Sequence, residues 1–370
     1  MAELQKVVGL MSGTSLDGID AALVETDGEG IVRPGPALFV AYAPELRAIL
    51  KAALDAASSF PADAATPPSI QDAERRVTEA HADAVRQLLE SANIRPVEIA
   101  LLGFHGQTIL HRPRERRTWQ IGDGAQLAKL TGIAVVNDFR AADIAAGGEG
   151  APFAPLYHAA LARQTAGLAL PVAVLNIGGV ANVTFVGRDT VLAFDTGPGN
   201  APLDDWAFKH TGKPMDENGR LARSGKVDAP ILARMMESPF FSRRPPKSLD
   251  RMDFGFEPVD ALSPADGAAT LATFTAASIA RAAEHFPEPV SGWIVCGGGR
   301  LNTALVSALR RSVRVPVRSA ENAGWRGDFI EAEAFAYLAA RSVKGLPLSL
   351  PTTTGVPQPM TGGRLHRAAA

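Results

Sequence analysis

Short apolar runs bounded by turn residues mark five strands in the first half of the chain. They fall at residues 6–11, 19–25, 37–42, 99–104 and 133–137, and are rich in the β-branched and aromatic residues that favour strands. Apolar positions with helical spacing follow at residues 44–57 and 69–91. The first half is therefore predicted to form a mixed α/β lobe.

The second half repeats this order of elements. Strands are predicted at residues 172–177, 182–186, 191–194, 293–296 and 313–317, and helices near 267–285, 301–310 and 329–343. Two similar α/β lobes around one central cleft are the simplest architecture for this repeat. We expect an N-terminal lobe over residues 1–165 and a C-terminal lobe over 166–370, with the option that the C-terminal tail packs back on the first lobe.

Segments rich in proline and glycine separate these elements. Residues 32–36, 60–68 and 345–363 are interpreted as surface loops or tails. Residues 240–246, with two arginines and two prolines, are interpreted as an exposed connection. Such segments are usually solvated linkers, although one beside a cleft can also serve as a lid.

Composition narrows the class of protein. The 370 residues are 46% hydrophobic and carry a formal charge of -2, so a folded protein without a broad positive surface is expected. Nucleic acid and membranes are therefore unlikely as partners. The sequence shows no secretory signal and no apolar run of membrane-spanning length, so a cytoplasmic location is expected. Cys296 is the only cysteine, which excludes an intrachain disulfide and a cysteine-rich zinc site.

The first glycine-rich hairpin, residues 13–20, has the composition of a phosphate-binding turn. Small residues let backbone N–H groups approach an anion, and the hydroxyl groups of Thr14 and Ser15 donate to phosphate oxygens. Asp17 is a candidate ligand for Mg²⁺, directly or through water. The alternative is a tight hairpin stabilised by an Asx turn, which is the more frequent explanation for a single loop of this kind.

Two further glycine-rich turns follow predicted strands in the second half. Gly178 and Gly179 lie in the first of these turns, and Asn182 lies just beyond them. The second turn consists of Gly297, Gly298 and Gly299. Glycine backbone at a strand-to-helix turn can pass close under a nucleoside, although an ordinary turn explains it equally well. No Walker P-loop occurs, so ATP would bind without a Walker lysine.

The carboxylate candidate is Asp195, at the end of an apolar run and followed by a turn sequence. An acid in this position is suited to act as a general base or to organise Mg²⁺. The alternative makes it an Asx-turn residue. Asp204 and Asp205 fit the first turn of a helix better, because acids there interact favourably with the helix dipole.

Polar side chains also follow two strands of the first half. Gln107 and Thr108 offer neutral donors and acceptors suited to sugar hydroxyls, whereas His105 has no partner acid that the sequence identifies. Arg140 is suited to grip a carboxylate such as a lactyl group in a fork geometry. A structural pair between Asp138 and Arg140 is the rival interpretation.

Together these motifs resemble the anhydro-N-acetylmuramic acid kinase family. The resemblance spans nearly the whole chain and rests on residues 11–20, 104–108, 120–123, 138–140, 146–152, 176–184, 195–200 and 331–336. It implies a two-lobed fold of the actin, Hsp70 and hexokinase type, which is ribonuclease H-like. The chain has Glu149 where many members of the family carry glutamine, so a hydrogen bond donated by that side chain is in question.

The resemblance implies an ATP- and Mg²⁺-dependent kinase that opens the 1,6-anhydro ring of 1,6-anhydro-N-acetylmuramic acid and phosphorylates O6, in cell-wall (peptidoglycan) recycling. Asp195 would be the catalytic base, and Gln107, Thr108, Arg140 and Glu331 the sugar contacts, although Glu331 also fits an outward-facing helix position. Nucleotide phosphates and metal would be held by Gly13, Thr14, Ser15, Leu16, Asp17, Gly18, Ile19 and Asp20, with Gly178, Gly179 and Asn182 opposite and Gly297, Gly298 and Gly299 at the nucleoside. A homodimer is also implied.

Two other functions stay open at this point. A kinase of another anhydro sugar, such as levoglucosan, would use the same chemistry without a lactyl pocket, and Arg140 favours the first substrate. A nucleotide-dependent binding protein on the same two-lobed scaffold is the alternative from another class.

Overall fold

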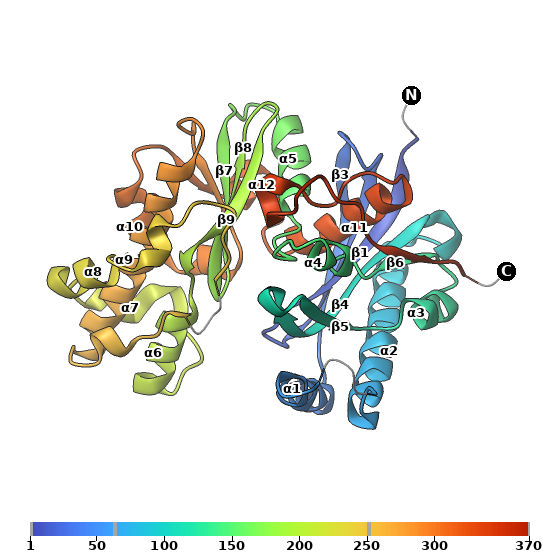
Figure 1. The fold of residues 1–370 in the computed structure, drawn as a ribbon, viewed down its shortest axis with the longest axis horizontal. Helices are drawn as coiled ribbons and strands as arrows, with labels where there is room; N and C mark the ends of the chain where they lie inside the picture. The colour runs from blue at the N-terminus through green and yellow to red at the C-terminus, as the bar shows by residue number, and fades with distance from the viewer. Residues whose placement is uncertain (1–2, 62–64, 250–252, 369–370) are drawn as a thin grey trace. The chain divides into compact units, whose positions relative to one another are not determined.

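The chain divides into two compact units. The computed structural model describes residues 3–61, 65–249 and 253–368 (Figure 1). Unit 1 comprises Met1–Gln164 together with Phe329–Ala370, and unit 2 comprises Thr165–Asp328. Each unit has its own sheet, and each is described separately below.

Unit 1 is built on a sheet with the strand order β3-β2-β1-β4-β6-β12. The hairpins β1-β2 and β2-β3 are antiparallel, β4 runs parallel to β1, β6 runs parallel to β4, and β12 is antiparallel to β6. A further strand, β5, pairs with β4. The strand bounds are β1 Gln5–Ser12, β2 Gly18–Thr26, β3 Val32–Ala41, β4 Leu101–Arg112, β5 Arg117–Ile121, β6 Val135–Asn137 and β12 Arg364–His366.

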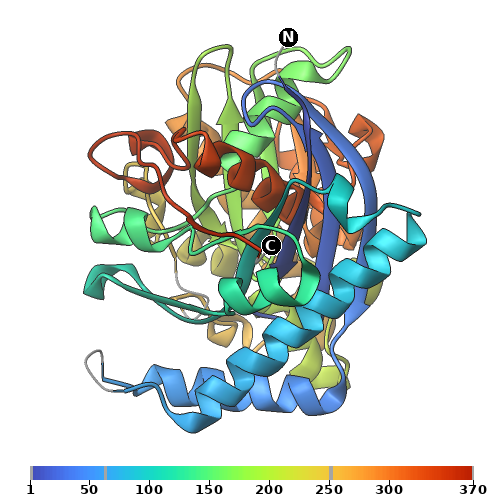
Figure 2. The same cartoon turned by 90° about the vertical axis from the view of Figure 1, so that its right-hand side faces the viewer.

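Helices cover both faces of this sheet. Val8 and Leu10 of β1 pack with Val85 and Leu88 of α2, which Figure 2 shows crossing the strands. Gly9 points to the opposite face, where α11 lies, because side chains alternate along a strand. The helix bounds are α1 Pro44–Ser58, α2 Pro68–Ser91, α3 Gly124–Thr131, α4 Ala141–Ala145, α5 Pro155–Gln164, α11 Ile330–Val343 and α12 Pro351–Thr354.

Helix α11 belongs to unit 1, whereas the expected second lobe covered residues 166–370 with the option that its C-terminal tail packs back on the first lobe. Gly9 and Gly103 are register partners on β1 and β4, and a Cβ atom at either would collide with the backbone of α11, at Ala332 and Phe335 respectively. The two glycines therefore form a shallow groove that lets α11 pack directly on the sheet of unit 1. Unit 2 accordingly ends at Asp328.

Unit 2 repeats the plan of unit 1 with the strand order β11-β10-β7-β8-β9. The hairpins β7-β8 and β8-β9 are antiparallel, and β10 runs parallel to both β7 and β11. The bounds are β7 Val172–Ile177, β8 Val180–Val186, β9 Val191–Pro198, β10 Trp293–Cys296 and β11 Val317–Ser319. The shared plan of three antiparallel strands followed by parallel ones confirms the predicted duplicated α/β fold of ribonuclease H-like type.

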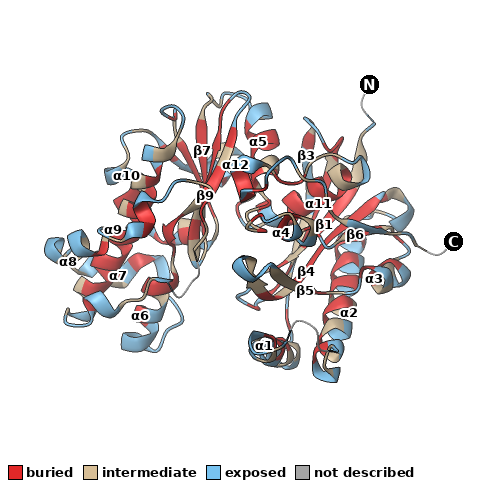
Figure 3. Cartoon of the chain, in the orientation of Figure 1, coloured by how far each residue is buried: buried red, intermediate tan, exposed pale blue. Residues whose placement is uncertain are grey.

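The helices of unit 2 pack around a second apolar core. Trp206 of α6, Phe274 of α9 and the neighbouring Phe241 are buried together in it. The bounds are α6 Ala201–Thr211, α7 Arg220–Ser224, α8 Ala229–Met235, α9 Pro264–Ala282 and α10 Thr303–Ser312. Figure 3 shows the buried strands and the exposed outer faces of these helices.

Three loop predictions need correction. Residues 240–246 are not simply an exposed connection, because Phe240 and Phe241 are buried in the core of unit 2. Residues 32–36 belong to β3, and the segment 345–363 contains α12, where Thr354 is fully buried. Of the predicted loop 60–68, residues 62–64 lie outside the described residues. Within the described parts of the chain, every helix is too short or too polar to cross a membrane.

Candidate active site

The predicted phosphate-binding hairpin lies between β1 and β2 in unit 1. The backbone N–H of Leu16 donates to the carbonyl of Gly13 at 3.3 Å, which closes the turn. Leu16 and Ile19 point into the apolar core, so they build the hairpin and do not face a ligand with their side chains. Thr14 and Ser15 are exposed. Leu16 and Ile19 therefore anchor the hairpin in the core, while Thr14 and Ser15 remain accessible to solvent.

Asp17 has the surroundings of a carboxylate that can bind a cation. Its side chain is exposed, the hydroxyl of Ser15 donates to Oδ1 at 2.9 Å, and its carbonyl accepts the N–H of Tyr42 at 2.9 Å. Mg²⁺ in nucleotide enzymes is usually held by one or two carboxylates, with waters and phosphate oxygens completing its shell. A single carboxylate beside a hydroxyl fits that requirement. Asp20 is half-buried in β2, opposite Met11 of β1.

Gln107 is fully buried and holds the hairpin. Its Nε2 donates to the carbonyl of Gly13 at 3.0 Å, while the hydroxyl of Ser12 donates to the carbonyl of Gly106 at 3.2 Å. The Gln107 Oε1 atom is buried without a hydrogen-bond partner among the described residues. Its neighbour Thr108 is half-buried, and its Oγ1 accepts Nε2 of Gln120 at 3.1 Å. Gln107 is thus tied directly to the turn that is predicted to bind phosphate.

Arg140 is fixed by a histidine and a carbonyl. Its Nε donates to His105 Nε2 at 3.0 Å, its Nη1 donates to the carbonyl of Gly150, and its guanidinium lies over the ring of Phe153. Arginine only donates, so His105 Nε2 carries no proton, and Nδ1–H donates to the carbonyl of Gly106 at 2.8 Å. The rival pair with Asp138 is thus not the contact that orients this guanidinium.

Burial, followed by the charge of Arg140, keeps His105 neutral. Burial, and then the positive charge of Arg140, hold the pKa of His105 well below its usual range. Burial lowers the pKa of Arg140 itself to about 10, and the charges of Glu331 and Asp143 oppose this shift. Glu331 keeps exposed surface, yet the dense protein around its carboxyl raises its pKa, with Arg140 acting in the opposite direction. Arg140 and Glu331 therefore form one electrostatic group in unit 1.

Sequence reasoning missed Asp143, which supports the loop that receives Arg140. Its Oδ1 accepts the N–H of Gly150 at 2.7 Å, and its Oδ2 accepts the hydroxyl of Thr354 at 2.6 Å. Gly150 lies only 7 positions further along the chain, but Thr354 is 211 positions away, and no local pattern distinguishes this buried acid from a surface helix residue. It joins α4, the loop at Gly150 and α12 into one support for Arg140.

In unit 2, Asp195 belongs to a row of polar side chains across the sheet. Asn182 of β8 lies opposite Asp195 of β9 and also opposite Asn176 of β7, and Cys296 of β10 lies opposite Asn176. Residues directly opposite each other on neighbouring strands share one face of a sheet. The row therefore places the candidate base on the same face as Asn182 and in line with the glycine-rich turn that follows Cys296.

A neighbouring segment holds the Asp195 carboxylate. The backbone N–H of Leu249 donates to Asp195 Oδ2 at 2.8 Å, and the N–H of Asp195 donates to the carbonyl of Lys247 at 3.0 Å. The hydrogen bond from Leu249 favours one orientation of the carboxylate. This geometry is compatible with a general base.

The three glycine-rich turns each contain a glycine that packing does not require. A Cβ atom at Gly13 or Gly178 would meet no neighbour closer than 3.5 Å, and one at Gly298 would meet nothing within 4 Å. By contrast, a Cβ atom at Gly18 would collide with β3 and one at Gly299 with the side chain of Ile177. Open space above a glycine lets a ligand approach the backbone. Each turn therefore has one position suited to a close ligand.

The other residues of these turns have structural contacts. The carbonyls of Gly178 and Gly179 accept N–H groups from the start of α6, with Asn200 donating to Gly178 at 2.7 Å. Gly297 has a φ of +75°, which glycine adopts without strain, and it lies against the side chain of Asn176. Sequence reasoning identified these turns but not the contacts that hold them.

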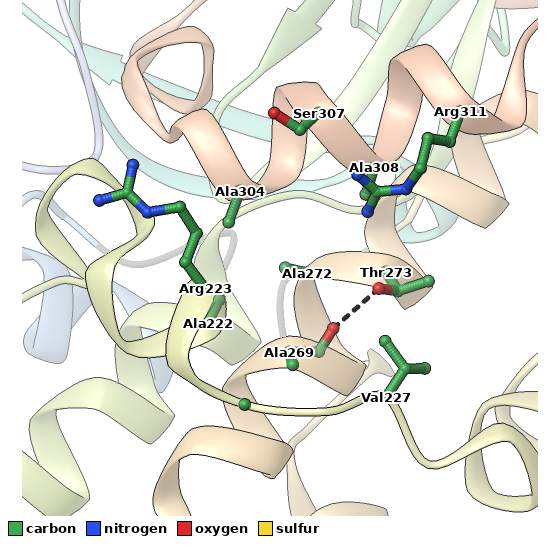
Figure 4. A pocket seen from close by; sticks show the side chains of 11 residues that line it. Ala222, Arg223, Val227, Ala269, Ala272, Thr273, Ala304, Ser307, Ala308 and Arg311 are labelled. Atoms are coloured by element: carbon green, nitrogen blue, oxygen red, sulfur yellow. Dashed lines mark hydrogen bonds between the residues drawn. The ribbon is translucent and has the colours of Figure 1, made fainter.

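A pocket of about 340 Å³ lies in unit 2 beside the third turn (Figure 4). Its walls come from α7, α9 and α10, and Ala304 in its lining is in the first turn of α10, directly after the glycine-rich turn. The floor consists mainly of alanine, including Ala269 and Ala272, and Arg223 and Arg311 stand at its sides. The lining contains two cations and no acid, so it favours an anionic or electron-rich ligand.

Comparison with known proteins identifies relatives over nearly the whole chain. The family model described as Anhydro-N-acetylmuramic acid kinase matches residues 5–368. The chain is 52% identical over 363 residues to the protein of that name from Paramagnetospirillum magneticum, covering 97% of this chain and 99% of the relative. It is also 52% identical over 366 residues to the one from Nitrobacter winogradskyi, covering 98% and 100%.

A solved structure with a similar course of the chain is the ROK family glucokinase from Streptomyces griseus in complex with glucose and AMPPNP. It is 15% identical, with a TM-score of 0.43, and the match covers 90% of this chain and 98% of that one.

Proposed function

The chain belongs to the anhydro-N-acetylmuramic acid kinase family, and on that premise we propose that it uses ATP to open the 1,6-anhydro ring of 1,6-anhydro-N-acetylmuramic acid and to phosphorylate O6. The observation that carries this proposal is the family match across residues 5–368. The position of Asp195 in the polar row of unit 2 supports it independently, because the reaction needs one oriented base.

The reaction needs one proton acceptor. Water attacks the anomeric carbon and gives its proton to Asp195, while the bond between that carbon and O6 breaks. O6 forms its new bond to the γ-phosphorus, and ADP leaves. Ordinary glycoside hydrolysis needs a second carboxylic acid to protonate the leaving oxygen. Here phosphoryl transfer takes over that role, so a single base suffices.

Each unit is proposed to contribute open glycines to nucleotide binding. Gly13 and Gly178 offer backbone to the phosphates, and Gly298 offers it to the nucleoside, whose base is suited to the alanine-lined pocket beside Ala304. Asp17 is proposed to hold Mg²⁺, which would neutralise charge that develops on the phosphoryl oxygens.

The sugar is proposed to bind at the Arg140 group of unit 1. Nε and Nη1 of Arg140 are used by His105 and Gly150, while the rest of its fork can pair with the lactyl carboxylate. Thr108 and Glu331 are proposed to contact sugar hydroxyls. Gln107 contributes chiefly by holding Gly13, because its side chain is fully buried.

The test is an ADP-release assay with Mg-ATP and three sugars: 1,6-anhydro-N-acetylmuramic acid, levoglucosan and N-acetylmuramic acid. We expect turnover with the first alone and a product heavier than the substrate by one water and one phosphoryl group. Turnover with levoglucosan instead would assign the chain to another anhydro sugar. ATP binding without turnover on any of the three would favour a non-enzymatic nucleotide-binding role.

A further inference from the structure

Lys247 is a buried cation that the proposed reaction does not use. Only 4% of the residue is exposed, and its Nζ donates to the carbonyls of Phe240 at 3.1 Å and Phe241 at 3.3 Å. His285 Nε2 lies 3.4 Å from the same atom, and the ring centroid of Phe240 is 4.6 Å away. Burying an ammonium group among aromatic rings is costly unless partners compensate for it. A lysine in this place therefore calls for a reason beyond packing.

The main chain at Lys247 runs beside the candidate base. The carbonyl of Lys247 accepts the N–H of Asp195 at 3.0 Å, and two residues later the N–H of Leu249 donates to Asp195 Oδ2 at 2.8 Å. The strand residue and its carboxylate are therefore both held by the segment 247–249. A displacement of that segment would move the hydrogen bond that orients the carboxylate.

The side chain of Lys247 ties this segment to two other elements. Phe240 and Phe241 belong to the 3-10 turn Pro239–Ser242, and His285 ends the turn Ala283–His285 after α9. Both turns border the core of unit 2. The ammonium group is thus the point at which the segment beside Asp195 is fastened to that core.

Charged groups surround Lys247 on several sides. Arg243 on the same connection and Arg281 on α9 repel its charge, whereas Asp195 on β9 and Glu284 beside His285 attract it. Among the residues that the structure describes, Asp195 and Glu284 are therefore the acids that favour the ammonium form. In return, the positive charge favours the ionised carboxylate that a general base requires.

We propose that Lys247 is a positioning residue for Asp195: it anchors segment 247–249 so that the N–H of Leu249 holds the carboxylate in its working orientation. This inference rests on the proposed function of Asp195 as the base. A catalytic group must be held to within about 0.5 Å, and a misplacement of about 1 Å costs on the order of 10²-fold in rate. Loss of the anchor should therefore lower kcat more than it changes nucleotide binding.

The experiment compares Lys247→Met and Lys247→Arg with Lys209→Met as a matched control. Lys209 also lies over aromatic rings of unit 2, those of Trp206 and Phe256, but its charge pairs with Asp260 and is more exposed. Each variant is measured for kcat, for KM of ATP and of 1,6-anhydro-N-acetylmuramic acid, and for thermal unfolding.

We expect K247M to lose kcat by about 10- to 10²-fold with KM for ATP nearly unchanged, and K247R to recover a large part of that loss because it keeps a buried cation. K209M should retain wild-type kcat. A folded K247M with kcat close to wild type would overturn the proposal. So would an equal loss in K247M and K247R accompanied by a matching rise in KM for ATP, since that pattern indicates general disruption of unit 2.

His285→Leu keeps the proposal testable if K247M does not fold. It removes one polar neighbour of the ammonium and keeps an apolar side chain at a half-buried site. We expect a several-fold lower kcat with unchanged KM for ATP, and wild-type kcat in folded H285L would contradict the proposal. Asp195→Asn distinguishes failure of the proposed function from failure of this inference. If D195N keeps its turnover, Asp195 is not the base and the proposed function fails. If D195N is inactive while K247M is fully active, only the role of Lys247 is refuted.

Discussion

Asp195→Asn removes the proposed base while leaving its surroundings in place. The amide oxygen of the new side chain can still accept the N–H of Leu249, which now donates to Asp195 Oδ2 at 2.8 Å. The register of β9 against β8, where Asp195 lies opposite Asn182, depends on backbone groups that the substitution does not change. The variant should therefore fold normally and bind ATP as the wild type does.

The expected loss lies in the chemical step. A positioned general base contributes about 10²- to 10⁴-fold to a rate, which corresponds to about 2.7 to 5.5 kcal/mol of activation free energy. We expect kcat of D195N to fall by at least about 10²-fold, with KM for ATP nearly unchanged.

The assay combines coupled ADP release with mass analysis of the product made in ¹⁸O-labelled water. In wild type the label should enter the anomeric hydroxyl, because water attacks that carbon. Asp205→Asn is the matched control, since Asp205 is an exposed acid on α6. Turnover of D195N within about threefold of wild type, in a variant shown to be folded, would remove Asp195 from the mechanism and refute the reasoning from the polar row.

The remaining predictions concern two glycines, Arg140 and the charge of Lys247. Gly13→Ala should raise KM for ATP without lowering the melting temperature, because the space above Gly13 is open. Gly299→Ala should instead lower the free energy of unfolding by about 1 to 3 kcal/mol, because the added methyl group collides with Ile177. Steady-state kinetics measures the first effect and urea unfolding the second. Arg140→Lys should raise KM for the lactyl sugar by about tenfold while KM for ATP stays constant, since lysine lacks the planar fork, and equal KM values would exclude the carboxylate contact. Burial lowers the pKa of Lys247 from 10.5 to about 8, so turnover should fall as pH rises through that value in wild type but not in K247R. Between a pH of about 8 and 10.5, Lys247 binds more protons in the unfolded chain than in the folded one, so it makes the free energy of unfolding rise with pH. If the free energy of unfolding, measured with urea, depends on pH in the same way in wild type and in K247M, this prediction is contradicted.

Local patterns in the sequence predicted the elements well where apolar runs are continuous. β7 and β10 have the predicted bounds, 172–177 and 293–296, because both are buried runs that end at polar or glycine residues. β4 was predicted to end at residue 104 but continues to Arg112. Its second part contains glycine and polar residues, which interrupt the apolar run that predicted the strand, yet it pairs with β5. The polar composition of β5 gave no strand pattern in the sequence.

For the candidate site, sequence motifs identified the turns and the candidate residues but not their partners. Their positions after apolar strand runs marked Asp195 and Arg140 as candidates. The structure showed that His105 orients Arg140 and that Asp143 supports the loop beside it. Lys247 likewise went unnoticed, because it directly follows the segment 240–246 that was interpreted as an exposed connection, yet it is buried.

The sequence by itself therefore determined the duplicated α/β plan, the three glycine-rich turns and the family, because each depends on short-range patterns or on the order of motifs. Tertiary structure alone decided that α11 packs on the sheet of unit 1, that Gln107 holds the hairpin, and that the segment at Lys247 brackets Asp195. These contacts join residues separated by tens or hundreds of positions. Local propensity does not predict such long-range contacts, because they form only when burial of apolar faces brings the elements together.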